Sequence, residues 1–503
     1  MTLDRPVRTR YAPSPTGNLH IGGVRTALYS WLYARHFNGQ FLLRIEDTDL
    51  ERSEERFTQD IYTSMKWLGL NWDEEPLYQS KRMDLYLAKA KELIERGHAY
   101  WCTCTEADVE KMREDQIAKG LKPMYDRRCR DKSLPQPKSG ANGVVRLKVP
   151  LDGHTEFEDL IRGPIRVENV EVDDFVLIRS NGAPTYNMSC VVDDVAQGMS
   201  HVIRGDDHIN NTPKQIHLYE FFGYEQPRFA HLPMVLGPDK KKLSKRNGEV
   251  STNSYRAEGF LPEAMLNFLA RLGWSHGDQE VFSLQELTQF FGFDHVQKAS
   301  GVFNPEKLLW LGGEHIRRTT PERLADIVVE DFASRFQPPA RLDRVKSPIG
   351  LQLVALIQPK VKRVQELAEQ LVPLLTPGAV TVDAATLKWN KDAHLKSATL
   401  AAVKQAMIEF RKRLEGAKAS PSRSGADSVW GNSPSLGDAG MSHADIDASL
   451  RQLGEQHGIK LGDLVQPMRL CVLGQSAGAS VFELLAILPW DLVEPRLEQV
   501  LSL

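Results

Sequence analysis

Residues 8–49, RTRYAPSPTGNLHIGGVRTALYSWLYARHFNGQFLLRIEDTD, predict a strand, a loop, a helix and a second strand, in that order. Two prolines and Gly17 interrupt regular structure after a short first strand over 7–11. Apolar residues then recur with helical spacing over 24–32, and an Asn-Gly pair ends that helix. The apolar run FLLRI that follows is typical of a buried parallel strand. The stretch therefore indicates an α/β fold whose ligand site lies at the carboxyl edge of the sheet.

The loop before the helix carries the sequence HIGG, from His20 to Gly23. Neither a GxGxxG sequence nor a Walker lysine is present there, so the two commonest phosphate-binding loops are excluded. The glycines allow a ligand to approach the backbone, and the free N–H groups of a helix N-terminus favour a phosphate. His20 can add a hydrogen-bond donor. By itself the motif favours a simpler interpretation, in which His20 caps the helix within a glycine-containing turn.

The whole stretch is more specific than this motif. APSPTGNLHIGG followed by LLRIEDTD resembles the nucleotide-binding start of glutamyl-tRNA synthetases, which are class I aminoacyl-tRNA synthetases, with HIGG in place of the class I signature HIGH. The resemblance implies a Rossmann-type catalytic domain. It also implies that His20 and Gly22 take part in catalysis, and that ATP is bound by Thr16, Gly17, His20 and Gly23.

Composition sets the broad class of the protein. A chain of 503 residues suggests about three or four domains, and its 41% apolar and 26% charged residues are ordinary for a globular protein. Apolar runs fall short of the roughly 20 residues that span a bilayer, and MTLDRPVRTR lacks the apolar core of a signal peptide. Five cysteines do not suggest a disulfide framework. We therefore expect a cytoplasmic protein without a membrane segment.

Three cysteines cluster in a stretch that predicts a candidate zinc site. Cys102, Cys104 and Cys129 can supply thiolates, and a carboxylate such as Asp131 can supply the fourth ligand. The alternative is that these cysteines are buried or adjacent by chance, because CxC is a weaker signal than CxxC. Tyr125 lies four residues before the last cysteine of the group.

The resemblance strengthens the zinc prediction but leaves the fourth ligand open. Many bacterial glutamyl-tRNA synthetases have CxC followed by CxH, and here Asp131 stands in place of that histidine. Related glutamyl-queuosine tRNA(Asp) synthetases use a tyrosine that matches Tyr125. The implied Zn²⁺ is structural, and it has Cys102, Cys104, Cys129 and either Asp131 or Tyr125 as ligands.

The middle of the chain predicts antiparallel strands and then a return to α/β structure. GVVRLKVP and HTEFEDLIRGPIRVENVEVDDFVLIRS alternate polar and apolar residues, and together they resemble the acceptor-stem domain of the family. SHVIRG then predicts a strand that ends near Arg204, a candidate anion clamp. An equally good interpretation from the residues alone is a surface arginine paired with Asp206 or Asp207.

The resemblance also implies an amino-acid site. The residues that match the glutamate contacts of the family are Arg10, Ser14, Glu46, Tyr186 and Arg204. Arginines can bind the substrate carboxylates, and Glu46 can bind its ammonium group. Some relatives have an asparagine four residues after the tyrosine, where this chain has Cys190, so that contact differs here.

GPDKKKLSKRNG is the second signature. A basic run is usually a solvated loop, but KLSKR resembles the class I sequence KMSKS, with Lys242 and Lys245 in register. A loop of lysines can close over a triphosphate and stabilise the charge on departing pyrophosphate. The resemblance therefore adds Lys242 and Lys245 to the catalytic residues, Lys245 to the ATP site, and Mg²⁺ as the cofactor bound with ATP.

The rest of the chain predicts helices, and its end, IKLGDLVQPMRLCVLGQSAGASVFELLAIL, resembles the last helical bundle of bacterial members of the family. A Gly-, Ser- and Ala-rich stretch over 415–443 predicts a loop or linker. The expected domains are a split Rossmann-type catalytic domain (1–100 and 190–250), an inserted α+β acceptor-stem domain (101–189), an all-α stem-contact connector (251–320) and an all-α anticodon-binding domain (321–503).

We thus expect activation of L-glutamate by ATP and transfer of the glutamyl group to tRNA(Glu), or also to tRNA(Gln), by a monomer. A glutaminyl enzyme of the same class has a β-barrel anticodon part, and a glutamyl-queuosine enzyme lacks the C-terminal third. A non-catalytic tRNA-binding paralogue and a small-molecule nucleotidyltransferase of the HxGH type are further alternatives. The first would not need His20, Lys245, Arg10 and Glu46, and the second would not need the helical C-terminus.

Overall fold

The structure is a computed structural model that describes residues 5–49, 51–136, 143–241, 251–335, 342–376, 393–417, 433–475 and 478–502. The chain forms two compact units. One consists of Met1–Ser254 and Met265–Pro305, and the other of Tyr255–Ala264 and Glu306–Leu503. Among the described helices, none is both long enough and apolar enough to cross a membrane.

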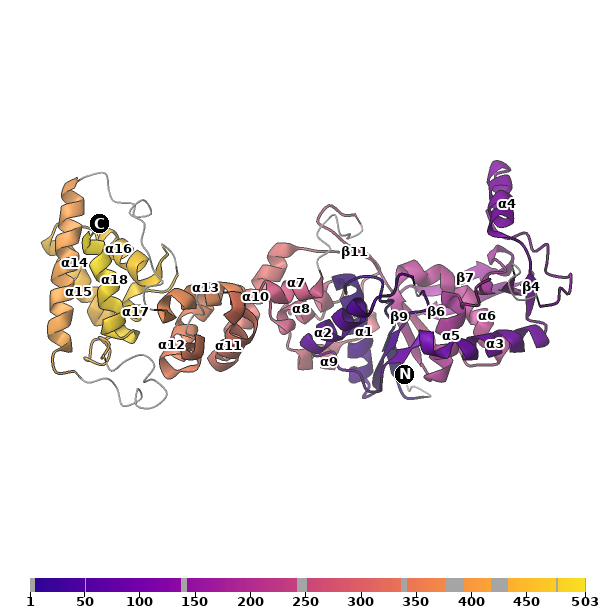
Figure 1. Ribbon diagram of the computed structural model, residues 1–503, viewed down its shortest axis with the longest axis horizontal. Helices are drawn as coiled ribbons and strands as arrows, with labels where there is room; N and C mark the ends of the chain where they lie inside the picture. Colours follow the sequence, from indigo (N-terminus) through magenta and orange to yellow (C-terminus); the bar gives the residue numbers. More distant parts are fainter. Residues whose placement is uncertain are drawn as a thin grey trace. The chain divides into compact units, whose positions relative to one another are not determined.

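The first unit contains the predicted strand–loop–helix–strand element. Strands β1 (Arg8–Tyr11) and β2 (Gln40–Ile45) are parallel, with Arg8 opposite Gln40, and helix α1 (Ile21–His36) lies between them in sequence. The prediction for this stretch is confirmed. Helix α1 is buried on more than the one face that its spacing predicted, because it packs against β1, β2 and also α9 (Leu284–Phe290) (Figure 1).

These strands belong to a larger parallel arrangement. Strand β3 (Leu77–Tyr78) extends β2 on one side. On the other side, the N–H of Ser200 donates to the carbonyl of Arg8 at 3.0 Å and brings β9 (His201–Gly205) beside β1. Strand β10 (Arg228–Leu232) then pairs in parallel with β9. The carboxyl ends of β1, β2, β9 and β10 therefore face the same edge, where open α/β sheets bind ligands.

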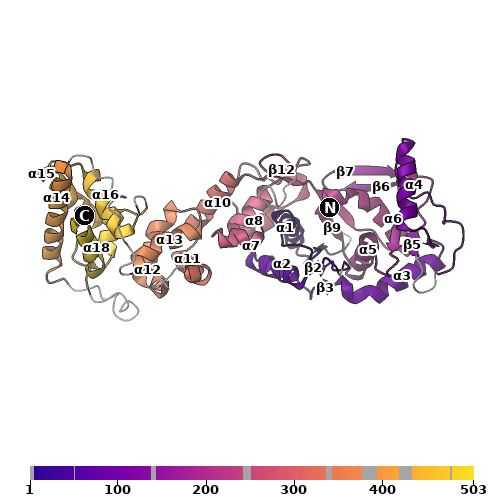
Figure 2. The same cartoon turned by 45° about the horizontal axis from the view of Figure 1, so that its top comes forward.

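The insert between the two halves of this arrangement contributes to it directly. Strands β6 (His154–Asp159) and β7 (Gly163–Glu168) form the predicted antiparallel hairpin, and β6 also pairs in parallel with β10. The four-stranded sheet has the order β7-β6-β10-β9, and Figure 2 shows the hairpin within this unit. The hairpin thus belongs to the same sheet as β9 and β10, although the sequence assigned it to a separate domain over 101–189.

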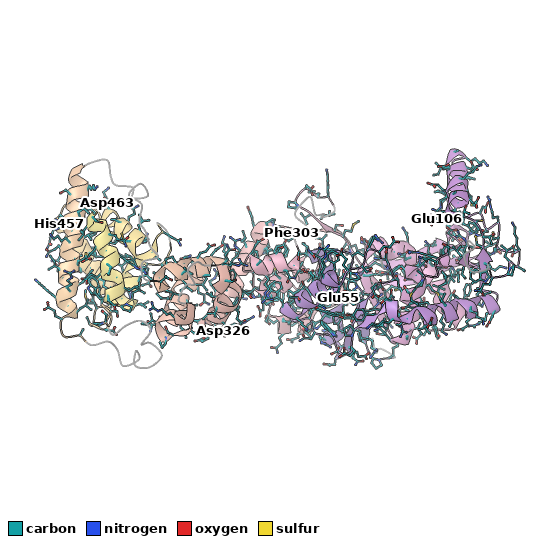
Figure 3. All side chains as sticks on the ribbon, in the orientation of Figure 1. Glu55, Glu106, Phe303, Asp326, His457 and Asp463 are labelled. Atoms are coloured by element: carbon teal, nitrogen blue, oxygen red, sulfur yellow. The ribbon has the colours of Figure 1, made fainter. Side chains whose placement is uncertain are left out.

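A smaller antiparallel sheet holds the remaining strands of the insert. It has the order β4-β5-β8, with β4 at Ala99–Cys102, β5 at Val144–Leu147 and β8 at Val176–Ile178. Helix α4 (Glu106–Ala118) follows β4 and stands away from the sheets of its unit, with Glu106 exposed at its start (Figure 3). The other elements of the first unit are α2 (Glu55–Trp67), α3 (Met83–Glu95), α5 (Tyr186–Ala196), α6 (Thr212–Phe222), β11 (Val235–Leu236) and β12 (Gly301–Val302), with short 3-10 turns at Gln79–Arg82, Asn169–Glu171, Asp206–Asn211 and Phe293–His295.

The described part of the second unit is helical, as predicted. Its buried apolar side chains form one cluster in space, whose first and last members in sequence are Leu261 and Leu497. The expected connector over 251–320 is divided, because residues 265–305 pack within the first unit and 306–320 within the second. Residues 418–432 of the predicted linker lie outside the described residues. The helices are α10 (Pro305–Arg318), α11 (Pro321–Ile327), α12 (Pro348–Ile357), α13 (Val364–Leu375), α14 (Ala393–Leu414), α15 (His443–Gln456), α16 (Leu461–Leu473), α17 (Val481–Ile487) and α18 (Trp490–Ser502), with α7 (Thr252–Ala257) and α8 (Pro262–Arg271) shared between the units, a π-helical turn at Val328–Phe332 and 3-10 turns at Ala333–Arg335, Leu342–Lys346 and Gln358–Lys360.

Candidate active site

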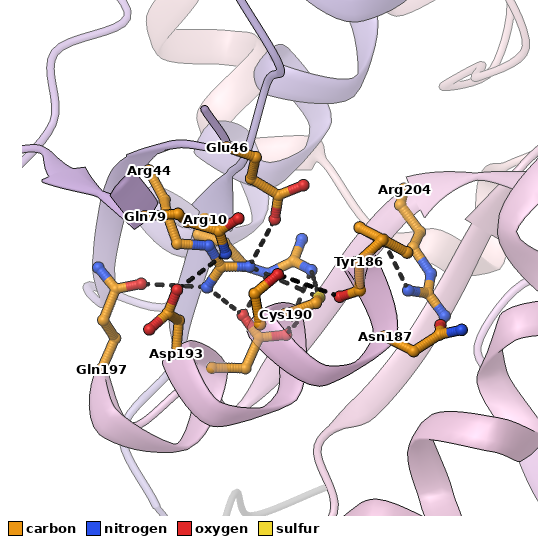
Figure 4. A network of polar contacts seen from close by, with 12 residues as sticks. Arg10, Arg44, Glu46, Gln79, Tyr186, Asn187, Cys190, Asp193, Gln197 and Arg204 are labelled. Atoms are coloured by element: carbon orange, nitrogen blue, oxygen red, sulfur yellow. Dashed lines mark hydrogen bonds and ion pairs between the residues drawn. The ribbon is translucent and has the colours of Figure 1, made fainter. Parts of the chain in front are cut away.

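Charged side chains from separate strands meet at the carboxyl edge of the sheet. Arg10 comes from β1, Glu46 directly follows β2, and Arg204 lies on β9. Tyr186 is the first residue of α5, which also carries Asp194. Figure 4 shows Arg10, Glu46, Tyr186 and Arg204 within one group of polar side chains. The structure therefore brings together four of the five residues that were expected to contact glutamate.

Asp194 holds two arginines in the floor of this site. Its carboxylate accepts from Arg10 Nε at 3.0 Å and from Arg10 Nη2 at 3.3 Å, and it also accepts from Arg44 Nη1 at 2.5 Å. All three side chains are at most 3% exposed. Burial opposes the ionisation of Asp194, but the two guanidinium groups outweigh it and lower the pKa of Asp194 to about 2.

Glu46 is the second carboxylate of the cluster. Its Oε1 accepts from Arg44 Nη2 at 3.1 Å, and the side chain is 8% exposed. Burial raises the pKa of Glu46 above its usual value, while Arg44 and Arg10 favour the ionised form. Cys190 lies between the charged groups, with Sγ 3.5 Å from Asp194 Oδ2. Burial raises the pKa of Cys190 to about 12, so the thiol is neutral at physiological pH.

Arg204 is held by neutral acceptors. Its Nη1 donates to Gln215 Oε1 at 2.7 Å and to the Tyr186 hydroxyl at 3.1 Å. Its Nη2 donates to Thr212 Oγ1 at 2.7 Å, and its Nε donates to His231 Nε2 at 3.1 Å. The side chain is 5% exposed. These contacts fix the plane of the guanidinium group without neutralising its charge.

The interpretation of Arg204 as a surface residue paired with a neighbouring aspartate is wrong. Asp206 instead pairs with Arg162 at 2.7 Å, and Asp207 is exposed. Within the part of the chain that the structure describes, no carboxylate lies within ion-pair distance of Arg204. Arg10 and Arg44 have Asp194 and Glu46 as direct partners, whereas Arg204 reaches its nearest carboxylate, Asp159, only through the His231 ring.

The HIGG turn forms the start of helix α1. His20 is the N-cap of α1, and its Nδ1 accepts from the N–H of Gly23 at 3.1 Å, as the capping interpretation predicted. A neutral His20 ring therefore carries its proton on Nε2. A side chain at position 23 would meet the hydroxyl of Tyr11, because a Cβ there would lie 2.6 Å from that oxygen. Gly23 thus lets α1 begin directly over the end of β1.

The other expected ATP contacts lie on the loop between β1 and α1. Thr16 is exposed and Gly17 is half-buried. Ser14, the fifth expected glutamate contact, is also exposed, and its carbonyl accepts from the N–H of Thr16 at 2.9 Å. Within the described residues, Ser14 makes no hydrogen bond to Arg10, Asp194 or Glu46, so it is not part of the buried network.

Lys242 and Lys245 lie outside the described residues. The segment that follows them is described, and it is attached to the HIGG turn. Ser251 forms a β-bridge with His20, and the N–H of Thr252 donates to the carbonyl of Leu19 at 3.0 Å. The end of the segment that contains KLSKR is therefore tied to the first signature, although more than 200 residues separate the two in sequence.

The cysteine cluster forms as predicted. The Sγ atoms of Cys102, Cys104 and Cys129 lie within 4.8 Å of one another, and this is the one such group of metal-binding side chains among the described residues. The Tyr125 hydroxyl lies 3.2 Å from Cys102 Sγ and 3.7 Å from Cys104 Sγ. Asp131 is 81% exposed and pairs with Lys148, so its carboxylate is not part of the cluster. Of the two residues that the sequence offered as fourth ligand, Tyr125 lies beside the thiols and Asp131 does not.

Comparisons with known proteins agree with this geometry. The model of the class I tRNA synthetase (E and Q) catalytic domain matches residues 6–310, and that of an anticodon-binding domain matches 434–501. A glutamate–tRNA ligase from Nitratidesulfovibrio vulgaris is 43% identical over 497 residues, which is 99% of each chain. The chain belongs to the glutamate–tRNA ligase family.

Other members of the glutamate–tRNA ligase family match over a similar length. A glutamate–tRNA ligase from Syntrophobacter fumaroxidans is 43% identical over 99% of this chain and 98% of its own. The crystal structure of a glutamate tRNA ligase from Elizabethkingia meningosepticum, solved in complex with its amino acid, has a TM-score of 0.78 and 28% identity, and it covers 99% of each chain. A glutamate–tRNA synthetase from Elizabethkingia anophelis has a TM-score of 0.74 and 27% identity, over 99% of this chain and 100% of its own.

Sequence reasoning missed several buried polar residues of this member of the glutamate–tRNA ligase family. Arg44 lies within FLLRI, Asp194 follows an apolar helical run, and His231 lies within the buried strand RFAHL. A charged or polar residue inside an apolar run signals a buried partner, since such a group is rarely buried alone. That signal was present at all three positions, but it does not identify the partner.

Proposed function

We propose that this protein is a glutamate–tRNA ligase that charges tRNA(Glu). The α-carboxylate of L-glutamate attacks the α-phosphorus of ATP, which gives glutamyl-adenylate and releases pyrophosphate. The acyl group then passes to a ribose hydroxyl of the terminal adenosine of the tRNA, and AMP leaves. This reaction needs no protein nucleophile, so the site has to position the substrates and stabilise charge.

The observation that carries the proposal is the buried, charged and unneutralised Arg204. A buried guanidinium without a counter-ion is costly, and a carboxylate ligand removes that cost. A carboxylate of bound glutamate would give Arg204 the direct ion-pair partner that it lacks among the described residues. The side-chain amide of glutamine carries no charge, so it cannot form that ion pair. The site therefore supports selection of glutamate by charge.

The remaining substrate atoms can be assigned to neighbouring groups. Arg10 uses Nε and Nη2 to hold Asp194, and its Nη1 is available to a second substrate carboxylate. Glu46 is placed to bind the ammonium group. His20 and the start of α1 face the ATP phosphates, and a Mg²⁺ ion bound with ATP would neutralise phosphate charge. Gly22 keeps the backbone accessible next to His20, and Lys242 and Lys245 act on the departing pyrophosphate.

We assign the recognition of tRNA to the insert over 101–189 and to the second unit. A helical anticodon part favours a glutamyl over a glutaminyl enzyme, and the presence of the C-terminal third disfavours a glutamyl-queuosine enzyme. The retained Arg10, Glu46 and His20 disfavour a non-catalytic tRNA-binding paralogue. We place the enzyme in the cytoplasm, where tRNA is charged, and expect it to act as a monomer.

The test is aminoacylation with labelled glutamate, using purified tRNA(Glu) and tRNA(Gln) in separate reactions and Lys245→Ala as the inactive control. Charging of tRNA(Glu) alone supports a discriminating enzyme, and charging of both supports a non-discriminating one. If folded wild-type protein charges neither tRNA, the proposed function is wrong and the non-catalytic paralogue takes its place.

The thiol cluster supports a structural Zn²⁺ site. Cys102, Cys104 and Cys129 supply three soft ligands, and Tyr125 presents an oxygen to the same point. We expect about one zinc ion per chain by elemental analysis after purification without chelators. Cys129→Ser should lose most of the metal, whereas Asp131→Asn should retain it. Loss of zinc in the Asp131 variant would restore Asp131 as a ligand.

A further inference from the structure

Arg204 depends on one histidine for the position of its inner N–H group. His231 Nε2 accepts from Arg204 Nε at 3.1 Å, and the His231 side chain is fully buried. The other two guanidinium nitrogens donate to Gln215, Thr212 and Tyr186. A histidine can accept at Nε2 only if its proton is on Nδ1. The orientation of Arg204 therefore requires one tautomer of His231.

Asp159 selects that tautomer. Its Oδ2 lies 2.6 Å from His231 Nδ1, and its side chain is also fully buried. An ionised carboxylate can only accept, so it draws the ring proton to Nδ1 and leaves Nε2 for Arg204. Burial lowers the pKa of His231, the Arg204 charge lowers it further, and Asp159 offsets this only in part. The ring is therefore neutral next to the guanidinium group.

Asp159 also organises the turn of the insert hairpin. It is the last residue of β6, and its Oδ1 accepts from the N–H groups of Ile161 and Arg162 at 3.0 and 2.8 Å. The Arg162 side chain in turn pairs with Asp206, just beyond β9. One carboxylate thus serves the β6–β7 turn with one oxygen and His231 with the other.

We propose that Asp159 and His231 are positioning residues that hold Arg204 in the orientation required for a substrate carboxylate, and that they connect the β6–β7 turn to the amino-acid site. The proposal rests on the proposed function, because it takes Arg204 as a glutamate contact. Displacement of the turn moves Asp159, changes the hydrogen bonding of His231 and weakens the hold on Arg204. A ligand that contacts the insert hairpin can therefore change the affinity of the site for glutamate.

The test uses two substitutions of His231, each of which removes one of its two contacts, the one with Arg204 or the one with Asp159. The amide of asparagine falls near the former Nδ1, so His231→Asn keeps the contact with Asp159 but leaves Arg204 Nε without an acceptor. We expect the KM for glutamate to rise by about tenfold to a hundredfold, the range for one lost hydrogen bond to a charged group. The KM for ATP and the kcat at saturating glutamate should change little. The amide of glutamine reaches the former Nε2, so His231→Gln should recover part of the loss.

His217→Asn is the matched control. His217 is a histidine with 2% exposure, and its Nε2 lies 3.1 Å from Thr155 Oγ1 on β6, but it does not contact Arg204. This variant should lose thermal stability and keep the wild-type KM for glutamate. If His217→Asn and His231→Asn raise that KM equally, the effect is general damage to the hairpin and the proposal is wrong.

A second readout does not depend on charging activity. In Asp159→Asn, the side-chain oxygen still serves the turn, and the amide nitrogen donates to His231 Nδ1 but can no longer accept from the backbone N–H of His231, which donates to Oδ2 at 3.1 Å in the wild type. The ring proton must then move to Nε2, where it opposes Arg204 Nε–H. Nitrogen NMR of histidine-labelled full-length protein should report the Nδ1–H tautomer for His231 in the wild type and the Nε2–H tautomer in the variant. If wild type and variant show the same tautomer, the proposed role of Asp159 and His231 is wrong, even when the wild type charges tRNA. If the tautomer switches as expected but the wild type charges no tRNA, that role stands and the proposed function is rejected.

Discussion

Replacing Arg204 with glutamine is expected to raise the KM for glutamate by about a hundredfold to a thousandfold, the effect of leaving a buried charge without its partner. Glutamine can still donate one hydrogen bond but carries no charge. A bound glutamate would then place a carboxylate among Tyr186, Gln215 and Thr212 with no cation directly beside it. The measurement is steady-state aminoacylation over a range of glutamate concentrations at saturating ATP and tRNA.

Two further variants serve as controls for this result. Arg204→Lys keeps the charge but not the planar fork that meets several acceptors at once, so it should recover only part of the activity. Arg166→Gln removes an exposed arginine of β7 that pairs with Glu168, and it should leave the KM unchanged. A wild-type KM in Arg204→Gln would mean that the substrate carboxylate binds elsewhere.

The largest expected effect on stability comes from Asp194→Asn. This change removes the charge that Arg10 and Arg44 share in a site that is almost closed to solvent. We expect a loss of about 2–5 kcal/mol of folding free energy, because two buried guanidinium groups lose their common counter-ion. Thermal unfolding of the full chain should show the transition of the first unit at a lower temperature. Glu168→Gln, which breaks an exposed pair, should shift that transition little.

The same carboxylate gives the wild-type protein a defined acid sensitivity. The pKa of Asp194 is about 2 in the folded protein, which is below the usual value of 3.8 for an aspartate in an unfolded chain. The unfolded state therefore binds a proton more readily, so this contribution is fully present above about pH 4. It is lost as the pH falls from about 4 to 2. The stability difference between wild type and Asp194→Asn should shrink over that interval, and a constant difference would show that Asp194 is not ionised.

Local sequence patterns were sufficient to predict these helices and strands and to identify the residues that belong to the family motifs. Apolar spacing and an Asn-Gly pair located α1 and β2, and alternation located the β6–β7 hairpin. The helix starts three residues before Val24, because the His20 cap extends it and periodicity does not detect caps. These features depend on neighbours in sequence, which the sequence displays directly.

The residues that the sequence did not reveal depend on distant partners. Asp194 contacts Arg10 across 184 positions, and Asp159 contacts His231 across 72. Asp131 was the preferred fourth ligand because it replaces a family histidine, yet its carboxylate pairs with Lys148 on the surface. Tyr125 occupies the position beside the thiols because its ring is buried under the Arg146 guanidinium, 3.8 Å from the ring centroid. Side-chain direction, rather than spacing, brings Tyr125 and not Asp131 next to the thiols.

The pairing of β6 with β10 limits how this protein can be divided by recombination. An exchange of residues 101–189 between relatives transfers the adjacent strands β7 and β6 of the β7-β6-β10-β9 sheet together with Asp159, while His231 and Arg204 stay with the recipient. Such a chimera joins a donor carboxylate to a recipient histidine at a contact of 2.6 Å, where small differences in strand register matter. The insert is therefore not an exchangeable cassette. Crossover points that preserve this contact must take β6 and β10 from the same parent, and those that also preserve the contact of His231 with Arg204 must include β9.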